Sequence, residues 1–224
     1  MENDIIEIKY AMDTFYFLIS GVLVMWMAAG FTMLEAGLVR SKNTTEILAK
    51  NVALYSIACV MYLIMGYTVM YGGITNLYVP DGFFGISASN ATADEVLASG
   101  GDTYYSGASD FFFQVVFVAT AMSIVSGAVA ERMKLWAFLA FAVVMTGFIY
   151  PMQGSWSWGG GFLGENIGYS DYAGSGIVHL CGAAAALAGV LILGPRIGKY
   201  SPSGESNAMP GANMPLATIG MFIL

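Results

Sequence analysis

The segment from Asp171 to Gly189 contains the residue best suited to proton chemistry, His179. It is the only histidine of the chain, and it lies in a run of small and apolar residues. An imidazole titrates near neutral pH and can both donate and accept a proton, which suits a relay. Inside a membrane, such a group is costly and usually lines a pathway. In a soluble protein, a histidine on an apolar face is more often a core residue whose hydrogen bonds are made by its neighbours. The interpretation therefore depends on whether this is a membrane protein.

Aromatic residues form a second candidate site. Phe113 and Phe117 are four residues apart, so they share one face of a helix. Trp158 lies in the segment QGSWSWGGG at residues 153–161. Aromatic faces attract a small cation by roughly 2 kcal/mol when the site is desolvated. The alternatives are an interfacial aromatic belt for Trp156 and Trp158, and core or lipid-facing packing for the two phenylalanines.

The composition indicates a membrane protein that must position these side chains. Of 224 residues, 57% are hydrophobic and 10% are charged, against roughly 25% charged in a typical soluble domain. Five segments contain a single charge among them, Glu35, and each reaches the roughly 20 residues that span a bilayer. We therefore predict an all-α polytopic membrane protein with five complete transmembrane helices and the start of a sixth. The predicted spans are residues 14–38, 51–79, 111–130, 135–164 and 172–195.

The basic residues predict the orientation. All Lys and Arg residues except Lys9 lie in the connections after the first, third and fifth spans. The connections at residues 74–110 and 152–171 contain none. By the positive-inside rule, the basic connections face the cytoplasm and the N-terminus lies outside. A multi-pass protein of the cell membrane is the expected localisation.

This topology brings the candidate residues together at the outer side. We expect Ser109 and Asp110 to cap the third span, and the fourth span to break before Pro151. Asp171 is the predicted N-cap of the fifth span, a structural role favoured over that of a counter-ion for the substrate. His179 follows eight residues later, about 12 Å along the helix, near the middle of the membrane.

The fifth span is unusually rich in small residues, which allow close helix packing in lipid. On this ground we predict that it is the central helix of the bundle. The small residues are Gly174, Gly176, Gly182, Ala183, Ala184, Ala185, Ala186, Ala188 and Gly189.

Four motifs resemble the Amt/MEP/Rh ammonium transporter family, in its Amt/MEP branch. They are FTMLEAGLVRSKN at residues 31–43, GAVAER at 127–132, WGGG at 158–161 and DYAGS at 171–175. The resemblance runs through all five predicted spans. It implies a homotrimer in which each protomer has a narrow hydrophobic pore and about eleven helices in two inverted halves.

The resemblance also implies roles for individual residues. Trp158 matches the family's outer ammonium site, and Phe113 and Phe117 match its phenylalanines, Phe117 being one of the two that close the pore. His179 matches the first of two pore histidines whose imidazoles touch. Asp171 matches an aspartate that supports the site without binding the substrate.

The physics of ammonium agrees with such a pore. A bare cation costs tens of kcal/mol to move into a medium of low dielectric, by a Born estimate, whereas neutral ammonia costs far less. A pore can therefore recruit the cation outside, remove a proton and pass the neutral species. An imidazole is suited to carry that proton.

Residues 1–224 correspond to the N-terminal half of such a transporter domain. Residues 215–224 supply ten residues of a sixth span, half of what a span needs. The second pore phenylalanine, its neighbouring serine and the second histidine have no counterpart here. Two explanations stay open: a piece of a longer protein, which we favour because no span looks degraded, or a truncated, non-conducting product that needs a complementing half.

Other classes of function are also compatible with parts of the sequence. An ammonium-sensing domain of a signalling protein is the main alternative, and an Rh-like gas channel is disfavoured by Trp158 and the DYAGS motif. The sequence shows no nucleophile–base pair, metal-ligand cluster or phosphate loop, so we expect no enzyme, metal, cofactor or nucleic-acid partner. The expected partners are ammonium or ammonia, the lipid bilayer and further copies of the chain. A PII-type regulatory protein is a candidate for the basic connections, although these are first an orientation signal.

Overall fold

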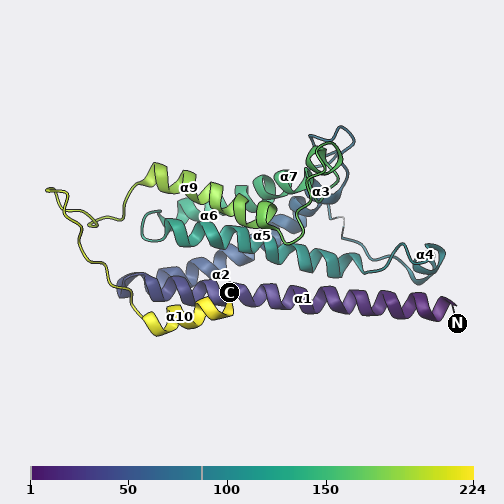
Figure 1. Cartoon of the computed structure of the whole chain (residues 1–224), viewed down its shortest axis with the longest axis horizontal. Coiled ribbons are helices and arrows are strands. Elements are labelled where there is room, and N and C mark those ends of the chain that lie inside the picture. The colour runs from purple at the N-terminus through teal and green to yellow at the C-terminus, as the bar shows by residue number, and fades with distance from the viewer. Residues whose placement is uncertain (1, 87) are drawn as a thin grey trace.

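A computed structural model describes residues 2–86 and 88–224. Within this part of the chain all regular elements are helices, and five of them are long and apolar enough to cross a membrane. This confirms the predicted all-α fold class and the five spans. The spans lie side by side in an elongated bundle (Figure 1). They run over Asn3–Leu38, Ser41–Tyr71, Gly107–Val129, Leu135–Ser155 and Ser175–Leu193.

The first two spans are longer or shifted relative to the prediction. Helix α1 (Glu2–Leu38) begins well before residue 14. The second span combines a short 3₁₀ turn (Ser41–Asn43), α2 (Thr44–Met61), a π-helical turn (Tyr62–Gly66) and α3 (Tyr67–Tyr71). It therefore begins about ten residues earlier than predicted. Lys50, which the prediction left outside the span, lies in α2 and is buried against Glu35 of α1.

The third span is the central helix. Helix α5 (Gly107–Val129) has most of its residues buried, including Val118, Ala121 and Met122 with no exposed surface. Its N-cap is Ser106, whose hydroxyl oxygen accepts a hydrogen bond from the Ser109 backbone N–H at 3.3 Å. The prediction of a cap at Ser109 and Asp110 was therefore wrong by about one turn.

The fourth span is continuous through its proline. It comprises α6 (Leu135–Val144), a π-helical turn (Met145–Ile149) and α7 (Tyr150–Ser155). Pro151 lacks an N–H and crowds the preceding turn of a regular helix. A π-helical turn directly before it accommodates this, so the predicted break before Pro151 is wrong.

The fifth span is at the edge of the described bundle. It consists of a π-helical turn (Ser175–Leu180) and α9 (Cys181–Leu193), and it packs along α5 with much of its surface exposed. The prediction that this span is central is wrong for the described residues, because α5 occupies that place. Its small residues instead allow close contact with α5: a Cβ on Gly182 would lie 2.7 Å from the Ala121 carbonyl oxygen.

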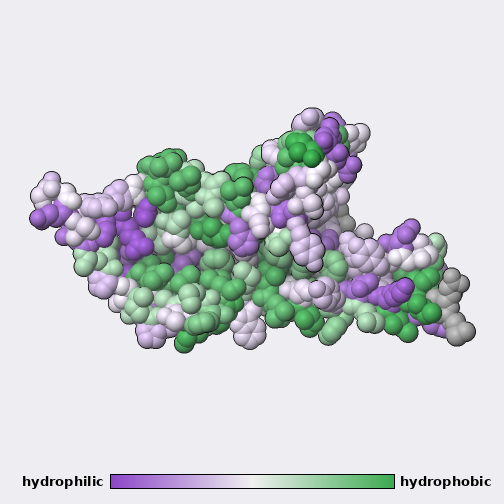
Figure 2. All heavy atoms as spheres, viewed as in Figure 1, coloured by the Kyte–Doolittle hydropathy of each residue, from purple (hydrophilic) through white to green (hydrophobic). Residues whose placement is uncertain are grey.

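The remaining helices are short. α4 (Ala93–Ala98) and α8 (Phe162–Glu165) lie in the connections after the second and fourth spans. α10 (Met214–Ile223), the start of the predicted sixth span, packs against the C-terminal part of α1 (Figure 1). Gly37 and Gly220 permit this approach, since a Cβ on Gly37 would lie 2.7 Å from that of Ala217. Apolar residues cover much of the bundle surface, while polar residues gather at the loop between α9 and α10 (Figure 2), as expected of helices in lipid.

Candidate functional site

An aromatic cavity of about 710 Å³ lies at one end of the bundle, which we call the Trp158 end. It is formed by α1, α3, α5, the WGGG segment and the residues before the fifth span. It brings together three of the predicted site residues, Phe113, Phe117 and Trp158. The full lining is Tyr16, Phe17, Ser20, Tyr67, Tyr71, Tyr105, Asp110, Phe113, Gln114, Phe117, Trp158, Tyr172 and Ala173.

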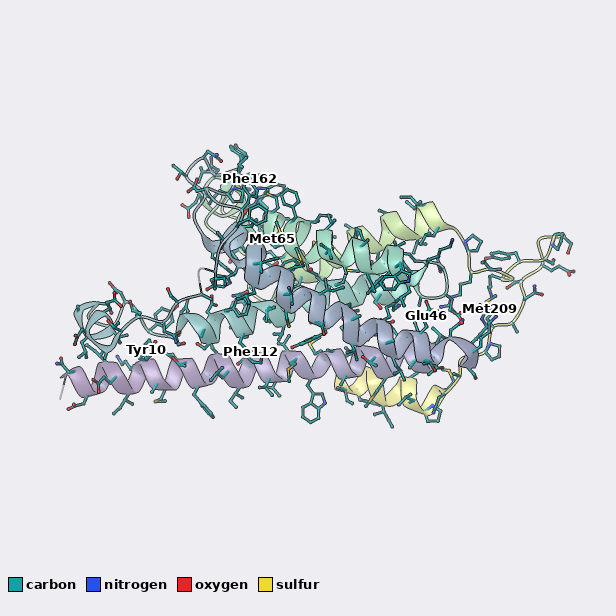
Figure 3. The ribbon with its side chains drawn as sticks, turned by 180° about the vertical axis from the view of Figure 1, so that it is seen from behind. Tyr10, Glu46, Met65, Phe112, Phe162 and Met209 are labelled. Carbon is teal, nitrogen blue, oxygen red and sulfur yellow. The ribbon has the colours of Figure 1, made fainter. Side chains whose placement is uncertain are left out.

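The rings of this cavity pack edge to face. The Phe113 and Phe117 centroids are 5.0 Å apart, and those of Phe117 and Trp158 are 6.5 Å apart. The ring centroid of Phe17, on α1, lies 5.2 Å from that of Phe113, and Phe17 also lines the cavity. The neighbouring Phe112 packs against α1 (Figure 3), where a Cβ on Gly21 would lie 2.8 Å from its ring. The α5 face is thus fixed against α1, and its aromatic rings hold a defined position.

The tryptophans have different environments. The Trp158 indole N–H donates a hydrogen bond to the Asp171 carbonyl oxygen at 2.6 Å, which fixes the ring at the cavity wall. The Trp156 indole N–H donates to the Tyr78 carbonyl oxygen at 2.8 Å, and its ring lies 5.5 Å from that of Phe162. Trp156 therefore holds the connecting loops together and does not line the aromatic cavity.

Asp171 organises the start of the fifth span. Its carboxylate accepts four backbone N–H groups at 2.7–3.0 Å, from Gly174, Ser175, Gly176 and Ile177. Gly174, with φ of 79°, is the capping residue itself, so the predicted N-cap was three residues early. The Asp171 side chain still satisfies the first N–H groups of the helix. Because its carbonyl holds Trp158, the same residue links the helix start to the cavity.

His179 lies outside the aromatic cavity. Its side chain is exposed, and it is not among the residues that line that cavity. Its Nδ1 lies 3.3 Å from the Gly174 carbonyl oxygen, which can only accept. This contact is a hydrogen bond in the tautomer that carries its proton on Nδ1, in which Nε2 is the acceptor. The structure therefore does not bring His179 together with Phe117 and Trp158 in one cavity.

The depth of His179 follows from the packing of the fifth span on α5. The span begins at Ser175, so His179 is its fifth residue, and the predicted 12 Å from the helix start is wrong. A Cβ on Gly174 would lie 3.3 Å from the Trp158 ring, and a Cβ on Gly182 would lie 2.7 Å from the Ala121 carbonyl oxygen. His179 therefore lies level with the middle of the 23-residue helix α5.

The opposite end, which we call the Glu131 end, carries paired charges. Buried Glu35 accepts hydrogen bonds through Oε2 from Lys50 at 3.2 Å and from Ser126 at 2.9 Å. Lys50 also lies 5.0 Å from the Phe138 ring centroid. Beyond the span, Glu131 pairs with Arg40 at 2.9 Å and Arg196 at 3.1 Å.

Two of these features were missed at the sequence level. Asp110 was assigned to a helix cap, yet Asp110, Phe113, Gln114 and Phe117 follow an i, i+3, i+4, i+7 pattern that predicts one shared helix face. The charge of Lys50 ends an apolar run, which predicts a position in a loop, whereas the structure places Lys50 in α2. The available signal was Glu35, an isolated acid in a span that required a buried partner.

The fold and these features define a multi-span helical membrane protein with an aromatic cavity at one end and paired charges at the other. A model of the Ammonium Transporter Family matches residues 15–224. The chain belongs to the ammonium transporter family.

Relatives and solved structures agree. The chain is 41% identical over 222 residues to Ammonium transporter Amt2 of Archaeoglobus fulgidus, covering 95% of this chain and 45% of the relative. It is 40% identical over 220 residues to Ammonium transporter Amt1 of Haloferax mediterranei, covering 93% and 40%. A solved "Sensor Amt Protein" superposes with a TM-score of 0.84 at 32% identity, covering 97% of this chain and 53% of that one. Candida albicans Mep2 shares the fold, with a TM-score of 0.77 at 22% identity over 98% and 47%. The chain spans about half the length of the curated relatives it matches.

Proposed function

We propose that this chain is the N-terminal part of a membrane transporter for ammonium and ammonia. The observation that carries the proposal is the aromatic cavity, in which Phe113, Phe117 and Trp158 present ring faces and edges to one space. A desolvated aromatic site attracts a small cation without a basic or metal-binding group. Membership of the family and the names of its relatives support ammonium as that cation.

The proposed mechanism separates recruitment from passage. The cation is held at Trp158 and Phe117, loses a proton, and crosses the apolar interior as ammonia. The proton travels by way of His179, whose Nε2 accepts it in the tautomer with a proton on Nδ1. Asp171 holds Trp158 and the start of the His179 helix in one arrangement, so we assign it a supporting role.

The exposed side of the fifth span requires a cover in this scheme. We propose that a further segment, from the same or another polypeptide, packs on the His179 face and completes the pore. The N-terminus and the Trp158 end face the outside of the cell membrane, as the basic residues at the other end support. We further propose that the transporter forms a homotrimer and that a PII-type regulatory protein binds its basic connections.

Uptake of radiolabelled methylammonium by cells expressing the reading frame that contains this chain tests the proposal. Trp158→Ala should raise KM about tenfold, the loss of about 1.4 kcal/mol of cation binding. Trp136→Ala is the matched control, because Trp136 is 81% exposed and remote from the cavity; it should leave KM unchanged. Equal effects of the two substitutions would reject the cavity as the recruitment site.

The role of His179 requires a different measurement. His179→Ala should abolish the ammonium-dependent current across a protein-containing membrane, because the proton loses its carrier. A variant that still carries an ammonium-selective current would reject the relay. Loss of the current in His179→Ala with the protein still present in the membrane separates this effect from misfolding.

A sensing function is the second candidate, favoured by the similarity to the solved "Sensor Amt Protein". It predicts that methylammonium binds the aromatic cavity and quenches tryptophan fluorescence, while uptake stays at the level of cells without the protein. Uptake above the level of cells without the protein would support transport and reject a purely sensing function.

A further inference from the structure

We propose that Asp110 and Gln114 form a second cation site in the aromatic cavity, ahead of Trp158, for a cation with several N–H donors. This inference rests on the proposed function, because it names a first station for the recruited cation. Both side chains line the cavity and stand one turn apart on α5. The Asp110 carboxylate accepts a hydrogen bond from the Tyr67 hydroxyl at 2.5 Å and from Gln114 Nε2 at 3.3 Å.

The charge of Asp110 has no fixed counterpart. Asp110 is 7% exposed, and none of the described residues lining the cavity is cationic. A buried carboxylate without a counter-charge is strongly disfavoured, and the start of a helix offers only a partial positive charge. An exchangeable cation in the cavity supplies the missing charge.

The chemistry of the ligand follows from the free acceptors. Gln114 Oε1 is buried and has no hydrogen-bond partner among the described residues. An unmade hydrogen bond of a buried acceptor is costly, so this oxygen favours a donor. Together with the carboxylate it offers two acceptors to one cation, as ammonium or a primary alkylammonium requires. Sodium and potassium carry no N–H donor.

The site stands on the route to Trp158. Asp110 and Phe117 are seven residues apart on α5, which corresponds to about 10 Å, and Phe113 lies between them. A cation held at Asp110 therefore passes along the Phe113 ring to reach Phe117 and Trp158, whose rings are 6.5 Å apart.

Methylammonium uptake with separate KM and Vmax tests the site. Asp110→Asn keeps the size of the side chain and an acceptor for Tyr67, and should raise KM about tenfold with Vmax unchanged. Asp110→Glu should restore KM towards the wild type. Asp102→Asn, at an exposed acid outside the cavity, is the matched control and should keep the KM of the wild type. An unchanged KM in Asp110→Asn, or a KM raised equally in Asp110→Asn and Asp102→Asn, would overturn the site and leave a structural role.

Two further measurements keep the inference independent of folding and of transport. If Asp110→Asn fails to accumulate, Gln114→Leu should raise KM, and an unchanged value counts against the site. Titration of the tryptophan fluorescence of the purified protein with methylammonium should give a weaker affinity in Asp110→Asn. If the wild type binds through Asp110 but takes up no methylammonium, the proposed transport fails while this site stands.

Discussion

The carboxylates at the two ends of the bundle have different partners. At the Glu131 end, Glu35 is paired with Lys50 inside the bundle, and Glu131 is paired with Arg40 and Arg196 beyond it. At the Trp158 end, Asp110 is held by neutral groups, a tyrosine and a glutamine, in a cavity lined by aromatic rings. The first arrangement uses fixed charge pairs to join helices. The second leaves a negative charge available to a mobile cation.

This difference indicates which end tolerates change. A fixed pair contributes to stability, and removing one partner leaves an uncompensated buried charge. An unpaired carboxylate in a cavity contributes to binding, and its neutralisation should spare the fold. Substitutions at the Glu131 end should therefore change stability, whereas substitutions in the cavity should change KM.

Lys50→Met is the strongest test of the paired end. It should lower stability by about 3–5 kcal/mol, because Glu35 stays buried without its cation. Thermal unfolding in detergent measures the effect. The double variant Lys50→Met with Glu35→Gln should recover most of the loss, since no charge is then left unpaired. Lys42→Met, at an exposed lysine of the same end, is the matched control and should unfold like the wild type. If Lys50→Met unfolds at the temperature of the wild type, the charge pair with Glu35 does not stabilise the fold, and the contrast between the two ends is wrong.

Asp171→Ala should have a smaller effect on stability, about 2 kcal/mol, because backbone N–H groups at the start of the fifth span lose their acceptor. The Trp158 indole should also shift its fluorescence, because its hydrogen-bond partner is the Asp171 carbonyl. Asp102→Ala, at an exposed acid, is the control for both readings. If Asp171→Ala changes KM but not stability, then Asp171 belongs with the cavity and not with the scaffold.

The spans were predictable from the sequence because an apolar run of membrane length has few other solutions. Their boundaries were not, since Lys50 is compatible with a span only when Glu35 lies opposite, and that contact depends on the packing of α1 on α2. Phe113, Phe117 and Trp158 were brought to one end by topology alone, and the structure places them in one cavity. Asp110 was mistaken for a cap because Ser106, one turn earlier, gave no stronger local signal. The position of His179 on an exposed face depends on how the fifth span is rotated against α5, which the run of small residues does not determine.

The weakest expected effect concerns pH and again separates the two ends. Burial alone would raise the pKa of Glu131, but hydrogen bonds from Arg40 and Asn43 and the charge of Arg40 outweigh it and hold the pKa below its usual 4.5. The folded state thus favours the ionised form of Glu131. The stabilising contribution of this carboxylate is present above pH 4.5 and is lost as the pH falls through the lowered pKa of the folded state. At neutral pH, Glu131→Gln should have a lower free energy of unfolding than the wild type. This difference should shrink as the pH falls through this range, because the wild type then loses the contribution of its charge pairs. Unfolding measured at a series of pH values tests this. Glu46→Gln, at an exposed acid beside the same loops, should show no such convergence. A gap that stays constant with pH would mean that Glu131 acts through its shape, in the left-handed backbone conformation it adopts at φ of 60°, and not through its charge pairs.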